Sequence, residues 1–170
     1  MRVRTLALVI ALSAVACGGS PTSPTGQAEQ FTWTVNGQTF TASSNGRGAL
    51  RPSGTANVSL TGSNCSVGAV ISVLAKNPAV GTFPVSNDGI SLRWIPDART
   101  STNQDAFDAP GLSGFNVGIG SGTVTITSLT SDWISGTFNV VATAFFTNQD
   151  KTSKTITGSF ELQFRDRVIC

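Results

Sequence analysis

The sequence predicts an all-β protein, an antiparallel β-sandwich of about nine or ten strands, with a closed β-barrel as the alternative. The 170 residues include 20 Ser, 22 Thr and 18 Gly, whereas the helix formers Lys, Glu and Met are scarce. Apolar and polar residues alternate in many short runs, which is the pattern of strands with one buried face. After residue 16, no segment carries the apolar stripe of an amphipathic helix. The length allows one domain.

The first two strands are predicted by the strongest local signal in the chain. Phe31, Trp33 and Val35 alternate with threonines. Asn36-Gly37 then supplies the two positive-φ positions of a tight hairpin turn, and a second strand is expected at 38–43.

The remaining strands are predicted in order from their apolar patterns. Residues 55–61 alternate, whereas residues 67–75 are apolar at both parities and indicate a central strand that is buried on both faces. A polar loop is expected at 96–111. Further strands are expected at 81–85, 90–95, 113–119, 123–129, 133–146 and 154–164.

Two of these strands share a sequence pattern. Residues 134–140 (ISGTFNV) and 156–162 (ITGSFEL) both read apolar, hydroxyl, Gly, hydroxyl, Phe, any residue, apolar. The glycine and the phenylalanine of each segment fall on one face, and a glycine within a strand lets a bulky neighbour come close. We therefore expect two neighbouring antiparallel strands that use the same packing device.

The first 16 residues have the layout of a secretory signal peptide. Arg2 and Arg4 precede an apolar run at 6–16, which is too short to span a bilayer. The segment from Ala14 to Cys17 resembles the lipobox of bacterial lipoproteins, in which the cysteine is acylated with diacylglycerol and the chain is cut before it. The alternative is an ordinary signal peptide that leaves Cys17 as a free thiol.

Residues 17–29 are rich in Gly, Ser, Pro and Thr and are expected to be a flexible tether before a β-domain at 30–170. The strand motifs at 122–127, 134–138 and 156–160, together with the hairpin at 31–41, resemble a group of uncharacterised bacterial lipoproteins with a small β-sandwich domain. This resemblance covers most of residues 30–165. It implies a lipid-anchored location in the cell envelope and a β-sandwich fold, and it implies no activity. Gly18 after the anchor favours the outer membrane or cell surface over the inner membrane.

Cys65 and Cys170 remain once Cys17 is assigned to the lipid anchor. In an oxidising compartment such a pair usually forms a disulfide. The disulfide would close a loop of about 100 residues, for which the chain-entropy model gives a stabilisation of about 4–5 kcal/mol. Free thiols and an intermolecular bridge through Cys170 are the alternatives.

Composition excludes several classes of function. The chain has 11 Lys and Arg, 9 Asp and Glu, and no His or Tyr. Because the chain has no histidine, the common Ser or Cys catalytic triads and the histidine-containing zinc motifs are excluded. The mature chain loses Arg2 and Arg4 and keeps no basic cluster, so nucleic-acid binding is not expected. A hydrolase built from dispersed carboxylates stays open as an alternative, although Glu29 and Glu161 are the only glutamates.

Two sets of residues are candidate binding sites. Trp133 falls in register with Ser135, Thr137 and Asn139, opposite the apolar positions of its strand, so Trp133 and Asn139 are candidates for an exposed sugar-stacking surface. The alternative is that Trp133 covers a core edge. Asp97, Asp105 and Asp108 lie in one polar loop and are weak candidates for a Ca²⁺ site; a solvated loop is the alternative, and no other cofactor is predicted.

These observations predict an exported, lipid-anchored protein rather than an enzyme. The leading hypothesis is an envelope module that presents a β-surface to a glycan, a peptide or a partner protein. The second hypothesis is a purely structural or assembly lipoprotein that has no small ligand.

Overall fold

The computed structural model describes residues 28–51, 55–99, 105–111, 119–145, 148 and 150–165. These residues form eleven strands and no α-helix. The strands are β1 (Gln30–Val35), β2 (Gln38–Thr41), β3 (Arg47–Leu50), β4 (Val58–Asn64), β5 (Ala69–Ala75), β6 (Gly81–Pro84), β7 (Ile90–Ile95), β8 (Phe107–Ala109), β9 (Ser121–Leu129), β10 (Trp133–Ala144) and β11 (Lys154–Gln163). The all-β, antiparallel prediction is confirmed. Among the described residues, no helix reaches the length and apolar character needed to cross a membrane.

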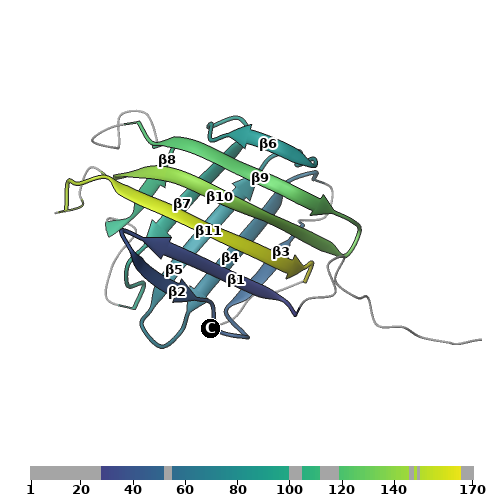
Figure 1. Ribbon diagram of the computed structural model, residues 1–170, viewed down its shortest axis with the longest axis horizontal. Helices are drawn as coiled ribbons and strands as arrows, with labels where there is room; N and C mark the ends of the chain where they lie inside the picture. The colour runs from purple at the N-terminus through teal and green to yellow at the C-terminus, as the bar shows by residue number, and fades with distance from the viewer. Residues whose placement is uncertain are drawn as a thin grey trace, which may run out of the picture.

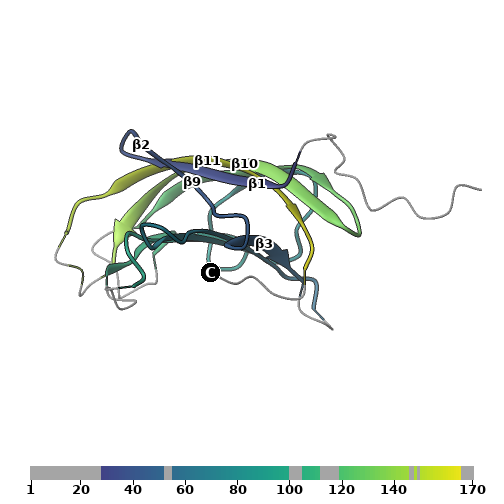
Figure 2. The same ribbon diagram turned by 90° about the horizontal axis from the view of Figure 1, so that it is seen from below.

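The strands form two layers that face each other (Figure 2). One layer has the order β2-β1-β11-β10-β9-β6, and the other has the order β3-β4-β5-β7-β8. The strands of the two layers run in clearly different directions (Figure 1). The long strand β10 joins the layers, because its last residues, Thr143 and Ala144, pair with β8. A parallel bridge between Ala49 and Phe164 links β3 to the end of β11.

The core lies between the layers and is built from the alternate residues of each strand whose side chains point inward. Phe31 is fully buried at its centre, with its ring 5.9–6.0 Å from the rings of Trp33, Phe138 and Phe160. Trp33 also stacks on Phe40 at 5.5 Å. Such edge-on and tilted aromatic contacts add to the free energy gained by burying the rings.

The Asn36-Gly37 hairpin is confirmed. Asn36 and Gly37 have φ values of 47° and 88°, both in the left-handed region that this turn requires. The Asn36 carboxamide also accepts a hydrogen bond from the backbone N–H of Thr155 at 3.2 Å, which ties the turn to the start of β11.

The two similar segments are neighbours, as expected, and their glycines and phenylalanines face each other reciprocally. In the register of β10 and β11, Gly136 lies opposite Phe160 and Phe138 lies opposite Gly158. A Cβ atom on Gly158 would lie 2.3 Å from the Phe138 ring and 2.5 Å from the Thr32 carbonyl oxygen. A Cβ on Gly136 would lie 2.7 Å from the Phe160 ring and 2.2 Å from the Thr125 carbonyl oxygen. Each ring therefore fills the space that the opposite glycine leaves.

Several strand predictions were wrong in detail. The short strands β3 and β8 were not predicted, and β8 lies inside the expected polar loop. Strand β5 is buried on one face only, because Leu74 on its outer face is 41 % exposed. Of the strand expected at 113–119, residues 113–118 lie outside the described residues. Ile119 belongs to no strand and is 87 % exposed.

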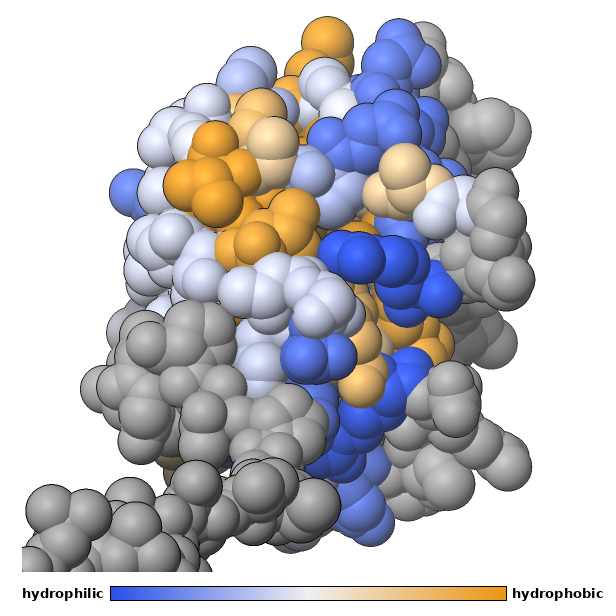
Figure 3. Space-filling model, turned by 90° about the vertical axis from the view of Figure 1, so that its right-hand side faces the viewer, coloured by the Kyte–Doolittle hydropathy of each residue, from blue (hydrophilic) through white to orange (hydrophobic). Residues whose placement is uncertain are grey.

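One charged cluster closes the side of the molecule where β1 begins and β11 ends. The side chain of Glu29 is 8 % exposed, and its carboxylate accepts hydrogen bonds from the Gln163 backbone N–H at 3.2 Å and from the Arg165 guanidinium. Arg47 on β3 lies 3.8 Å from the same carboxylate. Figure 3 views this side and shows a strip of hydrophilic residues beside a small apolar group.

Candidate functional site

Trp133 does not offer an exposed ring, so the sugar-stacking interpretation was wrong. The residue begins β10 on the outward parity, yet it is only 8 % exposed. Its backbone is held in a turn, in which the Trp133 N–H donates to the Thr130 hydroxyl at 3.0 Å and its carbonyl accepts from the Thr130 N–H at 2.9 Å. Ser135 and Glu161, on the same outward face, are also buried. Strand parity therefore fails as a guide to exposure at this end of β10.

Asn139 is exposed and belongs to an uncharged hydroxyl face on the outside of the six-stranded layer. Two adjacent rows of side chains cross all six strands in register. One row consists of Thr41, Thr32, Ser159, Thr137, Thr125 and Thr82, and the next consists of Thr39, Thr34, Thr157, Asn139, Thr123 and Pro84. Neighbouring hydroxyls bond to each other, for example Thr32 to Ser159 at 3.1 Å and Thr82 to Thr125 at 2.9 Å.

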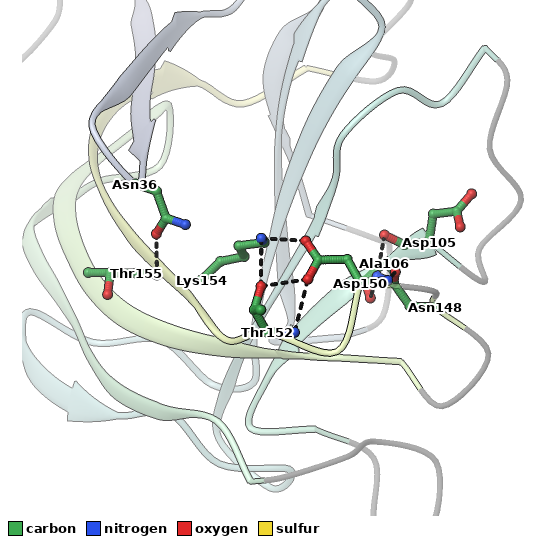
Figure 4. Close-up of polar contacts among 8 residues, drawn as sticks. All are labelled: Asn36, Asp105, Ala106, Asn148, Asp150, Thr152, Lys154 and Thr155. Atoms are coloured by element: carbon green, nitrogen blue, oxygen red, sulfur yellow. Dashed lines mark hydrogen bonds and ion pairs between the residues drawn. The ribbon is translucent and has the colours of Figure 1, made fainter.

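The three candidate calcium ligands are not gathered into one site. Asp97 accepts hydrogen bonds from the Arg99 guanidinium, with both contacts at 2.9 Å. Asp108 lies on β8 and pairs with Arg93, whereas the Asp105 carboxylate points away from its neighbours in Figure 4. Among the described residues, no three acidic, Cys or His side chains are close enough to hold a metal ion.

A groove on the outer face of the other layer is the best-formed candidate site. It has a volume of about 300 Å³ and lies over β4, β5 and β7. Its floor consists of Ser59, Leu74 and Ser91, which are paired in one row across the three strands, together with Ser72 of β5. The side chains of Lys76, Arg93 and Asp108 also line it, and so does the Pro110-Gly111 segment that follows β8. We call it the sheet groove.

The charged part of the sheet groove is a rigid ion pair. The Arg93 Nε and Nη2 atoms donate to the two carboxylate oxygens of Asp108 at 2.7 and 3.0 Å. This hydrogen bonding to Asp108 is the largest effect on the pKa of Arg93 and raises it above its ordinary value. Two parallel hydrogen bonds fix the plane of the guanidinium, and the buried position of Asp108 keeps competing water away. The Arg93 side chain itself remains about one-third exposed.

A second cation lies elsewhere along the sheet groove. The Lys76 ammonium donates to the Asn87 carbonyl oxygen at 2.6 Å, so the β6–β7 turn holds it in place. The lining residues therefore include two cations and one anion, which gives the groove a net positive charge. Leu74 lies on the floor as an apolar surface between hydroxyl groups.

Sequence reasoning missed the sheet groove, although it identified Asp108 as a candidate for another role. Ser59, Leu74, Ser91 and Arg93 sit on the outward parity of their strands, so the alternating pattern places them on one face. Their neighbours across the sheet depend on the order β4-β5-β7-β8, in which β6 leaves the layer and β8 enters it. No local motif in the sequence signals that order.

A separate charged turn connects β10 to β11. The Asp150 carboxylate accepts hydrogen bonds from the Thr152 backbone N–H at 2.9 Å and from the Lys154 ammonium (Figure 4). The pKa of Asp150 lies well below its usual range. The hydrogen bond from Lys154 lowers it most, and the hydrogen bond from the Thr152 hydroxyl comes next. Two residues before Asp150, the side-chain amide of Asn148 donates hydrogen bonds to the carbonyl oxygens of Asp105 and Ala106 at 3.1 and 3.3 Å.

The Asp150 contacts predict a small acid-sensitive contribution to stability. Because the folded pKa is lowered, the contribution is complete above the unfolded pKa of about 3.9 and is lost as pH falls toward the folded pKa. We expect Asp150→Asn to reduce the free energy of unfolding by less than about 1 kcal/mol at pH 7, since the Asp150 carboxylate is exposed. In urea titrations, the difference from wild type should shrink between about pH 4.5 and pH 2.5. A difference that stays constant with pH would contradict this assignment.

The predictions of an acylated cysteine and of a disulfide depend on Cys17 and Cys170, which lie toward the two ends of the given sequence. Cys17 and Cys170 lie outside the described residues, so acylation of Cys17 and the Cys65–Cys170 disulfide stay predictions. Cys65 follows β4 in the turn that leads to β5, where its backbone N–H donates to the Ser43 hydroxyl at 3.0 Å.

Comparison of the chain with models of known protein families, with curated proteins and with solved structures gives no match.

Proposed function

We propose that this chain is an exported, lipid-anchored protein of the bacterial envelope whose β-domain is a non-enzymatic binding module. The signal-peptide layout, the lipobox-like segment ending at Cys17 and the tether at 17–29 support the location. The observation that carries the binding role is the sheet groove, which combines one exposed leucine on its floor, several serine hydroxyls and a fixed guanidinium. Ligand sites commonly have this mixture of apolar surface and a few placed polar groups.

The groove replaces Trp133 as the expected point of contact. A glycan held by stacking needs an exposed aromatic ring, and among the described residues none that lines the groove is aromatic. Hydrogen bonds from the serines and from Arg93 would therefore provide specificity for a polar ligand. Leu74 would contribute the apolar contact.

A thermal-shift screen tests the binding role. The mature chain from residue 17, with Cys17→Ser to prevent acylation, would be mixed with cell-wall glycans, cell-wall peptides or Ca²⁺. A ligand at ten times its Kd should stabilise the protein by about 1.4 kcal/mol. We expect Leu74→Glu to abolish the shift because it places a charge on the groove floor.

Val141→Glu is the matched control. Val141 is 37 % exposed, close to the 41 % of Leu74, and it lies on β10 in the other layer. It should therefore keep the ligand-induced shift. A shift that survives Leu74→Glu would move the site elsewhere, and no shift with any ligand would favour a purely structural lipoprotein.

A further inference from the structure

We propose that the sheet groove binds a carboxylate ligand and that Arg93 holds the carboxylate through Nη1. This inference rests on the proposed binding function and names the chemical class of the ligand. Both a peptide C-terminus and an acidic sugar of the cell wall carry such a group. The shared chemistry is a carboxylate attached to a small body with apolar and hydrogen-bonding parts.

The geometry of Arg93 leaves one nitrogen for a ligand. Its Nε and Nη2 atoms are engaged by Asp108, and no described residue accepts a hydrogen bond from Nη1. Asp108 is buried, so the exposed part of the pair is the guanidinium edge. A guanidinium whose plane is already fixed loses little further side-chain entropy when it binds a carboxylate.

The charge and the floor of the groove agree with this ligand class. Lys76 adds a second cation to the groove. Of the lining residues that the structure describes, Asp108 alone is acidic, and it pairs with Arg93 and not with Lys76. Leu74 provides an apolar contact beside Arg93, with Ser59 and Ser91 on either side of it. A neutral ligand would leave this positive charge uncompensated, whereas an acid would complement it.

Two matched ligand pairs isolate the carboxylate. N-acetylmuramic acid can be compared with the amide of its lactyl carboxylate, and acetyl-D-alanyl-D-alanine can be compared with its C-terminal amide. Calorimetric titration of the mature chain with Cys17→Ser should show at least about tenfold tighter binding of the acid within one pair or both. The pair that shows the preference identifies the source of the carboxylate. The affinity of the protein for the acid of that pair should fall as the salt concentration is raised.

The variants test whether Arg93 causes the preference. Arg93→Met combined with Asp108→Asn removes the guanidinium without leaving a buried charge unpaired, and it should abolish the preference for the acid. Arg99→Met with Asp97→Asn is the matched control, because Arg99 contacts Asp97 through the same Nε and Nη2 atoms outside the groove. This control should keep the preference.

The outcomes separate the two proposals. If ligands bind in the groove but acid and neutral partners bind equally, the carboxylate inference is overturned while the binding function stands. Absence of binding by both pairs overturns the inference, and the wider ligand screen then decides the binding function. Should the Arg93 and Asp108 double variant fail to fold by circular dichroism, Lys76→Gln provides the second test. It should weaken binding of the acid about threefold or more and leave binding of the neutral partner unchanged.

Discussion

Gly158→Ala is expected to destabilise the protein by about 3 kcal/mol or more, which is the upper end for inserting a methyl group into a packed core. The added Cβ would lie 2.3 Å from the Phe138 ring and 2.5 Å from the Thr32 carbonyl oxygen. The carbonyl belongs to the backbone of β1 and cannot rotate away, so the β1–β11 pairing must shift. Urea denaturation followed by tryptophan fluorescence would measure the loss.

Two further variants show whether the cause is the close contact. Thr157→Ala changes the exposed neighbour on the same strand and should alter stability by less than about 0.5 kcal/mol. Phe138→Ala alone should cost about 3–5 kcal/mol because it leaves a cavity. Combined with Gly158→Ala, its cost should be clearly less than additive, since one of the two clashes is gone. Additive costs would mean that the ring and the glycine do not share this space.

The paired Gly and Phe positions also show how far sequence could predict the fold. The repeated pattern at 134–140 and 156–162 predicted two adjacent strands, because a mid-strand glycine is unfavourable unless something fills its place. The register that sets Gly136 against Phe160 and Gly158 against Phe138 gives the physical reason for the repetition. The Asn36-Gly37 turn was predictable for a similar reason, since few residues other than Asn and Gly adopt its two positive φ values.

Short strands were not predictable in the same way. Strand β8 has three residues, which is too few to display an alternating pattern. Strand β3 is as long as the predicted β6, but its sequence RGAL has two adjacent buried residues and does not alternate. Their place is set by tertiary contacts. β8 is held between β7 and β10, and its Asp108 is paired with Arg93 on the neighbouring strand. A sequence reading could only assign such a segment to a polar loop.

The candidate site depended on the same tertiary information. Leu74 looked like a buried residue of a central strand, because apolar residues occupy both parities at 67–75. It is instead an exposed floor residue of the sheet groove. Trp133 showed the opposite error, since its parity suggested exposure and its ring is buried. In both cases alternation describes which way a side chain points and not what covers it.

The second large effect is expected at Glu29, which precedes β1 and joins three parts of the chain. Its buried carboxylate contacts Arg47 of β3 and Arg165 after β11, and it accepts the Gln163 backbone N–H. Glu29→Gln keeps the shape of the side chain but removes the charge between two guanidinium groups. We expect a loss of about 2–3 kcal/mol in the free energy of unfolding, which is less than for a fully buried pair because both arginines are partly exposed.

A double-mutant cycle identifies the source of that loss. If Glu29→Gln destabilises mainly by leaving the Arg47 guanidinium without its counter-ion, then adding Arg47→Met should restore part of the stability, because the uncompensated charge is gone. Asp88→Asn, on an exposed turn, is the control for removing a carboxylate and should change stability by less than about 0.5 kcal/mol. A Glu29→Gln variant as stable as wild type would mean that the carboxylate does not hold β3 against the end of β11. The link between these parts would then rest on the Ala49–Phe164 bridge and on the hydrogen bond from the Arg165 N–H to the Ala49 carbonyl.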